Sequence, residues 1–200
     1  MDLVEFVAPY TMTGQDRRKA MAEALARIET KRIPGDIVEC GVWLGGNIIM
    51  SRKMAPERVC WLYDTFTGMA KPEEVDGQKA IGRYERQAGN WCRKSLDEVK
   101  AAFRETGVYD EAKLRFVEGL VEDTLPITKP ERIALLRLDT DWYSSTKIEL
   151  ELLYPRLSSG GVLIVDDYGH WDGARKAVDE YFPKARWVRI DYTAVMMVKP

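Results

Sequence analysis

The 200-residue sequence has little of the material on which zinc sites, disulfide scaffolds and membrane spans depend. It holds three widely spaced cysteines, Cys40, Cys60 and Cys92, and one histidine, His170, which are too few for a structural zinc cluster. Isolated cysteines in odd number indicate reduced thiols, so we expect a cytoplasmic protein. The N-terminal residues lack the basic start and apolar stretch of a signal peptide, and no apolar run reaches the roughly 18 residues of a transmembrane helix.

A large excess of charge of either sign is also missing. Thirty Lys and Arg residues stand against 32 Asp and Glu residues, for a net charge of −2. We therefore expect neither nucleic acid nor a membrane as a partner. Apolar residues make up 46% of the chain and charged residues 31%, which is an ordinary globular balance, and the length is that of one domain.

Short apolar runs alternate with helical patterns along the chain. The patterns predict strands over residues 36–40, 59–63, 114–117, 133–139, 162–166, 186–190 and 194–198, and helices over 16–31, 46–54, 96–106, 145–157 and 172–182. Residues 65–81 have little periodicity and several helix breakers, which indicates a long loop.

These elements predict an α/β fold. Strands with apolar interiors are typical of a parallel sheet that has helices on both faces. The last two strands are too close in sequence for a helical crossover and should pair as an antiparallel hairpin. We therefore expect a Rossmann-like class I methyltransferase fold with a seven-stranded, mostly parallel sheet. Residues 33–200 should form this single domain, and residues 1–32 a helical cap or lid.

Ligands of open α/β sheets bind beyond the carboxyl ends of the strands. The pattern places there Glu39, Gly41, Gly45, Asp64, Glu118, Gly119, Asp139, Asp141, Asp166 and Asp167. Glu39 would repel a pyrophosphate but would attract the positive amino group and sulfonium of S-adenosylmethionine. Asp64, at the end of the next strand, could accept hydrogen bonds from both ribose hydroxyls. Either acid alone is typical of a cap or a surface charge, but together they favour a nucleoside ligand.

Asp139, Asp166 and Asp167 follow two successive strands that should be neighbours in the sheet. Unpaired carboxylates so close together would repel one another, and a divalent cation would remove the repulsion. Carboxylate ligands without His or Cys favour Mg²⁺, Ca²⁺ or Mn²⁺. The alternative is that one residue of the Asp166-Asp167 pair caps the following loop or binds an arginine.

Two residues are candidates for the general base. Asp141 lies two positions beyond Asp139, where a carboxylate could take a proton from a hydroxyl held by the metal. It could equally cap the helix that follows. His170 lies in the loop after the fifth strand and is a second candidate, although a lone loop histidine is more often a surface residue.

Aromatic residues flank the same strand ends. Most of them should contribute to packing, but Phe66 and Trp142 could enclose an adenine ring. Tyr143, Tyr168 and Trp171 could form the wall of an acceptor pocket.

Five ordered motifs resemble the macrocin O-methyltransferase family from about Tyr10 to the C-terminus. They are Ile33-Pro-Gly-Asp-Ile-Val-Glu-Cys-Gly-Val-Trp-Leu-Gly-Gly46, Asp64-Thr-Phe-Thr-Gly-Met69, Leu138-Asp-Thr-Asp-Trp-Tyr-Ser-Ser-Thr146, Leu153-Tyr-Pro-Arg-Leu-Ser-Ser-Gly-Gly161 and Val165-Asp-Asp-Tyr-Gly169. The chain departs from the family pattern at Leu44, where a basic residue is usual, and at Thr140, where glycine is usual. It is also shorter than the typical member at its N-terminus.

The resemblance implies an enzyme that methylates sugar or phenolic hydroxyls in antibiotic pathways with S-adenosylmethionine and Mg²⁺. It implies metal ligation by Asp139, Asp166 and Asp167 and a base at Asp141. The implied cofactor contacts are Glu39, Gly41, Asp64, Phe66, Glu118 and Gly119, and residues 11–13 would cover the cofactor. It also implies a homo-oligomer, a dimer or larger, to which Met12 and Met21 could contribute.

Other functions fit parts of the pattern. The acid cluster could serve a Mg²⁺-dependent phosphohydrolase, for which Arg137 and Arg175 are the obvious basic residues. A non-catalytic nucleoside-binding protein or assembly partner is a third possibility. The identity of the acceptor stays open among sugars, aminosugars, cyclitols and phenols.

Overall fold

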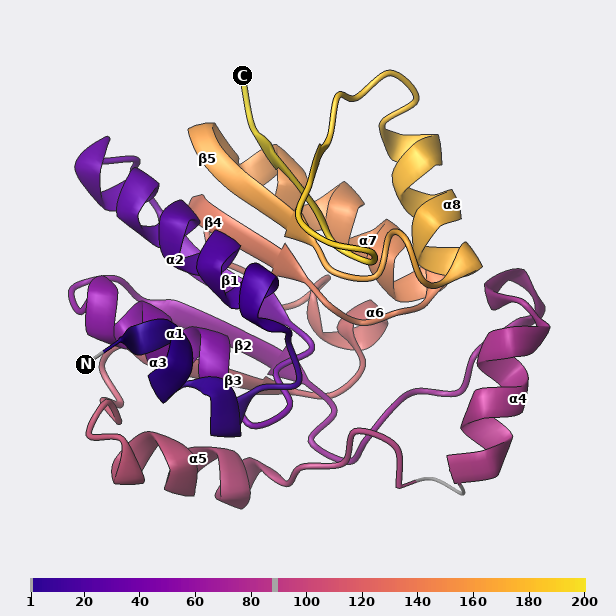
Figure 1. Ribbon diagram of the computed structural model, residues 1–200, viewed down its shortest axis with the longest axis horizontal. Coiled ribbons are helices and arrows are strands. Elements are labelled where there is room, and N and C mark those ends of the chain that lie inside the picture. The colour runs from indigo at the N-terminus through magenta and orange to yellow at the C-terminus, as the bar shows by residue number, and fades with distance from the viewer. Residues whose placement is uncertain (1, 88–89) are drawn as a thin grey trace.

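A seven-stranded sheet forms the centre of the computed structural model, which describes residues 2–87 and 90–200 (Figure 1). The strands are β1 Asp36–Cys40, β2 Cys60–Asp64, β3 Leu114–Glu118, β4 Ile133–Leu138, β5 Leu157–Val165, β6 Val188–Arg189 and β7 Val195–Val198, in the order β3-β2-β1-β4-β5-β7-β6. The first five are parallel, and β7 runs antiparallel to both β5 and β6. The predicted fold class is confirmed.

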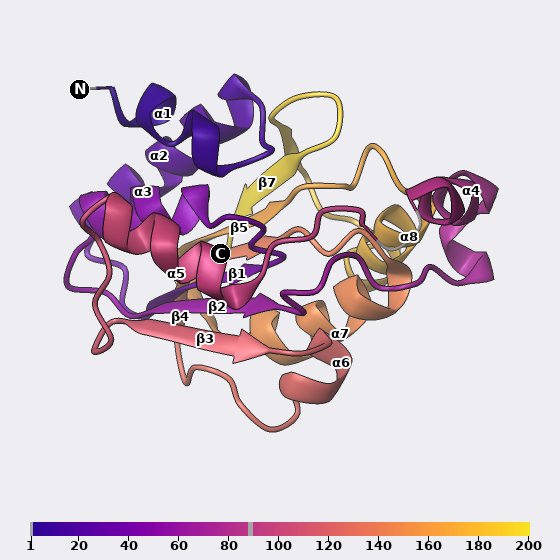
Figure 2. The ribbon, with the colours of Figure 1, turned by 90° about the horizontal axis from the view of Figure 1, so that it is seen from below.

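Helices cover both faces of the sheet (Figure 2). They are α1 Leu3–Phe6, α2 Gln15–Thr30, α3 Gly46–Met54, α4 Gln78–Gln87, α5 Leu96–Glu105, α6 Val121–Thr124, α7 Tyr143–Leu153 and α8 Asp172–Tyr181, with short 3₁₀ turns η1 Ala8–Tyr10, η2 Glu74–Asp76 and η3 Tyr154–Arg156. The helices α2, α3 and α5 pack on one face, and α6, α7 and α8 pack on the other. The sheet therefore lies between two apolar cores, one on each of its faces.

The parallel register decides where the site lies. Cys40 is level with Tyr63 on one side and with Leu138 on the other, and Leu138 is level with Val165. The residues that follow these four positions therefore leave the sheet at one edge. This edge is where ligands bind in open α/β folds.

The prediction of a long loop over residues 65–81 is wrong at its C-terminal end, where η2 and α4 form. The α4 helix, QKAIGRYERQ, is short, contains a glycine and is mostly polar, so its narrow apolar stripe of Ala80, Ile81 and Tyr84 was not distinguished from a loop. Its position depends instead on packing against tryptophans from distant parts of the chain. Two other boundaries also differ: β5 begins at Leu157, inside the predicted helix, and β6 is two residues long.

The N-terminal region contributes to both the core and the site. The α2 side chains Met21, Leu25 and Ile28 are buried in the same core as α3 and α5, so Met21 is not available to a subunit interface. Met12 is exposed, and residues 11–13 lie at the edge of the cavity described below. The separation of residues 1–32 as a cap stays a prediction.

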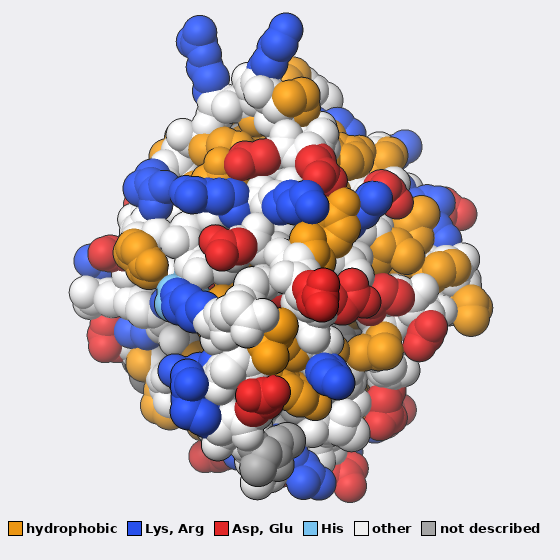
Figure 3. Space-filling model, turned by 90° about the vertical axis from the view of Figure 1, so that its right-hand side faces the viewer, with side chains coloured by type: hydrophobic (Ala, Val, Ile, Leu, Met, Phe, Trp, Pro, Cys, Tyr) orange, Lys and Arg blue, Asp and Glu red, His pale blue; other side chains and the backbone are white. Residues whose placement is uncertain are grey.

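Acidic and basic side chains are interspersed on the side of the molecule that carries α4 and α8 (Figure 3). Within residues 2–87 and 90–200, no helix combines the length and the apolar composition that crossing a bilayer requires.

Candidate active site

A cavity of about 440 Å³ opens at the carboxyl ends of β1, β2, β4 and β5. Most of the predicted site residues line it: Glu39, Gly41, Asp64, Gly119, Asp139, Asp141, Trp142, Asp167 and His170. Segments far from the strand ends complete the walls, among them residues 11–13, 68–70 and 91–92. The contribution of residues 91–92 was not predicted from the sequence, because Trp91 and Cys92 follow no strand end.

Two glycines shape the turn after β1. Gly41 has a φ of 82°, and a Cβ there would collide with the carbonyl oxygen of Asp139. Gly45 has a φ of 87°, and a Cβ there would strike the ring of Phe103. Gly41 therefore lets β1 and β4 end side by side at the cavity, whereas Gly45 serves packing beneath it.

Asp64 holds this turn in place. Its carboxylate accepts hydrogen bonds from the backbone N–H groups of Val42 at 2.7 Å and Trp43 at 3.1 Å, and from that of Phe66 at 2.8 Å. Each carboxylate oxygen can accept more than one hydrogen bond, and the group still faces the cavity. The ribose contact of Asp64 stays a prediction.

Phe66 and Glu118 lie differently from the expectation. The Phe66 side chain is 4% exposed and packs against Phe116 in the core, with 6.5 Å between ring centroids. It is therefore not placed to stack on an adenine. The Glu118 side chain is exposed, and neither residue is among those that line the cavity; the adjacent Gly119 does line it.

Trp142 belongs to a cluster of three tryptophans. Its ring centroid lies 5.7 Å from that of Trp91 and 5.4 Å from that of Trp171, both in edge-to-face geometry. The Trp142 indole N–H donates to the carbonyl oxygen of Ala70 over 2.9 Å. The cluster forms an apolar wall of the cavity with its polar N–H satisfied.

Of the three aromatic residues predicted to form the wall of an acceptor pocket, one lines the cavity. Trp171 lines the cavity. The hydroxyls of Tyr143 and Tyr168 instead donate to Glu180 and Asp179 of α8, each over 2.7 Å, and neither tyrosine lines the cavity. Both side chains are therefore directed to α8 rather than into the cavity.

Arg137, a buried residue of β4, bonds to carboxylates that come from β1, from the end of β4 and from the end of β5. Arg137, 2% exposed, donates from Nη1 to Glu39 Oε1 over 2.7 Å and to Asp139 Oδ2 over 2.8 Å, and from Nη2 to Asp166. The sequence signal for this role was a charged residue within an otherwise apolar strand. A guanidinium surrounded by carboxylates is not free to bind a phosphate, which removes the main support for a phosphohydrolase.

Glu39 is 1% exposed and lines the floor of the cavity. Its Oε1 accepts from Arg137 and, over 2.9 Å, from Asn47 Nδ2. Its Oε2 is buried and has no hydrogen-bond partner in the described part of the chain. Burial raises the pKa of Glu39, although Arg137 opposes the shift. The unpartnered oxygen is suited to a ligand that carries an ammonium group.

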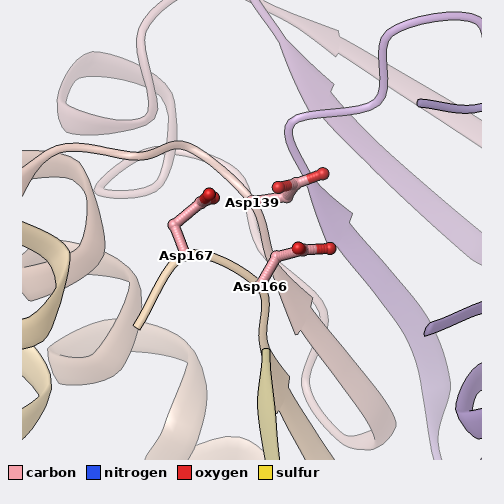
Figure 4. Close-up of side chains that lie close together, drawn as sticks. All are labelled: Asp139, Asp166 and Asp167. Carbon is pink, nitrogen blue, oxygen red and sulfur yellow. The ribbon is translucent and has the colours of Figure 1, made fainter. Parts of the chain in front are cut away.

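Asp139, Asp166 and Asp167 meet at the ends of β4 and β5 (Figure 4). One carboxylate oxygen from each lies within 4.8 Å of the others. Asp166 is fully buried and accepts from both Arg137 and Arg17. The expectation of unpaired, repelling carboxylates is therefore wrong for Asp166, because two arginines already neutralise it in part.

The cluster nevertheless fits a divalent cation. Asp167 Oδ2 is buried without a partner among the residues described. Burial raises the pKa values of Asp139 and Asp167 well above the ordinary range, and the neighbouring carboxylates add to both shifts. Glu39, Asp139, Asp141, Asp166 and Asp167 are five carboxylates against the two guanidinium groups of Arg17 and Arg137. A hard cation would balance this surplus of negative charge.

Asp141 stands beside the cluster in a left-handed backbone conformation, with a φ of 69°. It does not cap α7: the N–H of Tyr143 donates to Asp76 Oδ1 over 2.7 Å instead. Burial raises the pKa of Asp141 to about 7, and the charges of Asp139 and Asp166 contribute. Its carboxylate is therefore not committed to a helix end and lies beside Asp167 and Trp171 in the cavity.

His170 is half-buried and lines the cavity, and its backbone N–H donates to the carbonyl oxygen of Asp167 over 2.9 Å. Its ring lies edge-on to Trp171 with 4.4 Å between centroids, and Lys79 Nζ lies 3.5 Å from His170 Nδ1. Burial lowers the pKa of His170, and the charges of Lys79, Arg83 and Arg17 lower it further. Both effects favour the neutral imidazole.

Known proteins share this sequence and architecture. The sequence profile of the family Macrocin-O-methyltransferase (TylF) matches residues 5–199. The chain is 37% identical over 179 residues to 8-demethyl-8-(2,3-dimethoxy-alpha-L-rhamnosyl)-tetracenomycin-C 4'-O-methyltransferase of Streptomyces olivaceus, an alignment that covers 86% of this chain and 67% of the relative. It is 35% identical over 182 residues to demethyldecarbamoylnovobiocin O-methyltransferase of Streptomyces niveus, with coverage of 88% and 68%.

The solved structure of the O-methyltransferase NovP superposes with a TM-score of 0.86 at 32% identity, covering 95% of this chain and 82% of NovP. A putative caffeoyl-CoA O-methyltransferase from Staphylococcus aureus superposes with a TM-score of 0.62 at 14% identity, which shows the shared fold alone. The profile match, the two curated relatives and the cavity at the strand ends agree. The chain belongs to the macrocin O-methyltransferase family and is an S-adenosylmethionine-dependent O-methyltransferase.

Proposed function

We propose that this enzyme methylates a sugar hydroxyl of a small-molecule natural product and that a divalent cation at Asp139, Asp166 and Asp167 assists the transfer. The names of two relatives support the acceptor class. The Streptomyces olivaceus protein is named for a rhamnosyl compound. A third relative, at 34% identity over 181 residues, is named mycinamicin III 3''-O-methyltransferase, from Micromonospora griseorubida.

One observation carries the proposal. The residues expected to bind the methyl donor and the cluster of Asp139, Asp166 and Asp167 share one cavity, and Arg137 bonds to both groups. Glu39, with its unpartnered oxygen, and Asp64 lie at the ends of β1 and β2. Asp139 and Asp167 line the same cavity from β4 and β5. A methyl donor held at the first two would therefore face a hydroxyl held near the second two, as direct transfer requires.

The residues of the chain divide the chemistry among them. Glu39 binds the amino group of the methyl donor, Asp64 its ribose, and the glycine-rich turn lets the backbone approach it. Asp141 accepts the proton of the acceptor hydroxyl, and its pKa of about 7 is close to the optimum for a general base at neutral pH. The tryptophan cluster excludes water from the reacting atoms. A divalent cation bound at the three aspartates would supply positive charge that acidifies the hydroxyl.

His170 is the second candidate for the base, but its surroundings make it the weaker one. Lys79 and Arg83 bring positive charge to the ring, which disfavours the protonated product of base catalysis. Asp141 has the opposite environment, because neighbouring carboxylates favour its protonation.

The test is mass spectrometry of reactions with glycosylated natural products, the matching aglycones and simple phenols. We expect the mass gain of one methyl group on the glycosides, loss of the gain in EDTA, and recovery with Mg²⁺. Methylation of the aglycones or phenols alone would contradict the sugar assignment. Full turnover in EDTA would contradict the metal.

The predicted homo-oligomer is tested separately by light scattering after size-exclusion chromatography. The side chain of Met12 is 60% exposed and would become buried if the N-terminal region forms an interface. A strictly monomeric, active enzyme would contradict this prediction.

A further inference from the structure

The α4 helix forms one edge of the cavity although the sequence indicated a loop there. Asp76, in the turn before α4, is buried and fixes this segment: its Oδ1 accepts from Tyr143 N at 2.7 Å and its Oδ2 accepts from Glu73 N at 2.8 Å. A Cβ on Gly173, at the start of α8, would collide with Asp76 Oδ1. The α4 helix is thus anchored to the starts of α7 and α8, and its side chains have fixed positions relative to the cavity.

Two basic residues of α4, Lys79 and Arg83, lie one helical turn apart on the face that meets the tryptophan cluster. Lys79 Nζ is 4.8 Å from the ring centroid of Trp171 and 3.2 Å from the carbonyl oxygen of His170. Arg83 Cζ is 5.4 Å from the ring centroid of Trp91, and Arg83 lines the cavity. Both side chains therefore lie along an aromatic surface at the rim of the site.

Neither of these cations has a carboxylate partner. Within residues 2–87 and 90–200, the ion pairs formed by Lys and Arg do not include Lys79 or Arg83. Stacking on tryptophan directs a guanidinium but leaves its N–H donors free. Arg83 thus presents positive charge and unused donors toward the cavity, and Lys79 adds a second positive charge beside Trp171.

Negative and positive charges consequently lie in different parts of the cavity. The carboxylates of Asp139, Asp141 and Asp167 line one part of it; Arg83 lines another, and Lys79 lies next to the lining, against Trp171. An acceptor that is anionic at one end and has a hydroxyl at the other would be oriented by this field, with its hydroxyl toward the carboxylates.

We propose that Lys79 and Arg83 form an anion subsite and that the acceptor carries a phosphate, diphosphate or carboxylate group as well as the hydroxyl that is methylated. This inference rests on the proposed function and specifies the substrate class of the same cavity. A planar guanidinium matches the oxygen pairs of a phosphate or carboxylate, and a neighbouring ammonium adds a second charge-assisted hydrogen bond.

The test is a titration of the full-length enzyme with sodium pyrophosphate or sodium malonate, in EDTA at constant ionic strength, followed by tryptophan fluorescence. Trp91 and Trp171 lie against the two cations and serve as the probe. We expect a saturable change in tryptophan fluorescence with at least one of the two anions. Pyrophosphate alone would identify a phosphoryl group, and malonate alone a carboxylate.

The decisive comparison is between two double variants. The first, Lys79→Gln with Arg83→Gln, should weaken anion binding about tenfold or more. The matched control, Lys147→Gln with Lys176→Gln, removes the same charge from two lysines that lie over Tyr143, outside the cavity lining, and should bind as the wild type does. A third variant, Arg83→Lys, keeps the charge and should lose only the geometric match to the anion. Its loss of anion affinity should therefore be smaller than that of the first double variant.

Equal affinity in the two double variants, or no saturable binding of either anion by the wild-type enzyme, would overturn the subsite. Calorimetry with S-adenosylhomocysteine separates this outcome from failure of the proposed function. Normal S-adenosylhomocysteine binding without anion binding overturns the subsite alone. Anion binding without S-adenosylhomocysteine binding contradicts the methyltransferase site itself.

Discussion

Arg137 Nη1 lies 2.7 Å from Glu39 Oε1, a buried ion pair that links the strand expected to hold the methyl donor to the strand that carries the acid cluster. The same guanidinium also bonds Asp139 and Asp166. One side chain therefore maintains the geometry of both halves of the site, and its loss should affect both.

Arg137→Gln should lower the free energy of unfolding by about 3–5 kcal/mol, because buried carboxylates would lose their partner. Urea unfolding monitored by circular dichroism measures the change. The control is Arg175→Gln, which alters an exposed α8 side chain that lies over the ring of Tyr168. It should have little effect on the free energy of unfolding. Equal stability of the two variants would show that Arg137 does not balance the cluster.

Asp64→Ala should weaken the binding of S-adenosylmethionine by about 1.5–3 kcal/mol, which is the scale for hydrogen bonds to a charged group. The variant also removes the acceptor for the Val42 and Trp43 N–H groups, so the glycine-rich turn should loosen. Calorimetry measures the affinity, and Glu118→Gln, at the exposed end of the neighbouring strand, is the control. Unchanged affinity in Asp64→Ala would disprove the ribose contact.

Asp167→Asn is the sharper test of the metal site. Asp166 is tied to Arg17 and Arg137, so Asp166→Asn would disturb buried ion pairs as well as any metal. Asp167 has an unpartnered buried oxygen and a raised pKa, so neutralising it should not destabilise the metal-free fold. We expect Mn²⁺ affinity, measured by electron paramagnetic resonance, to fall about tenfold or more. Wild-type affinity would place the cation elsewhere.

Asp141→Asn should lower turnover by about 10²–10⁴-fold while cofactor and metal still bind, because it removes the general base. His170→Ala should have the smaller effect. The reverse order, with a slow His170→Ala and a normal Asp141→Asn, would assign the base to His170. Rates under saturating cofactor and metal distinguish the two.

The same variant should change how stability depends on pH. The pKa of Asp141 is raised from 3.8 to about 7, so the folded state binds more protons than the unfolded state between these values. The stability that this group contributes is present at low pH and is lost as the pH rises through about 7. In EDTA, the wild type should therefore lose stability relative to Asp141→Asn as the pH rises from about 4 to about 7. A constant difference in unfolding free energy would contradict the raised pKa.

Thr140 separates Asp139 from Asp141, and its hydroxyl donates to Glu149 of α7 over 2.9 Å. Glu149 is fully buried, and burial raises its pKa well above the ordinary range. Thr140→Val should destabilise the enzyme by about 1–3 kcal/mol, because it leaves a buried polar group without its partner. Thr140→Ser keeps the hydroxyl and should stay close to wild type in urea unfolding. Comparable losses in both variants would point to packing rather than to the hydrogen bond.

Local patterns determined the fold class and the position of the site. Apolar strand interiors alternating with amphipathic helices require a covered parallel sheet, and the carboxyl ends of its strands meet at one edge. Asp139, Asp166 and Asp167 each end or follow a strand, so their proximity was predictable from order alone. The last two strands, too close for a crossover, were likewise bound to pair antiparallel.

Tertiary structure decided the features that depend on long-range packing. The ion pairs of Arg137 with Glu39 and of Arg17 with Asp166 join residues 98 and 149 positions apart, which no local pattern reports. Phe66 follows a strand end as predicted, yet its backbone adopts a φ of 53° and its ring packs in the core against Phe116. The α4 helix has only a narrow apolar stripe in a mostly polar sequence and is positioned by Asp76 and the tryptophan cluster. Interactions that form only after the chain has folded therefore set the charge balance and the rim of the cavity.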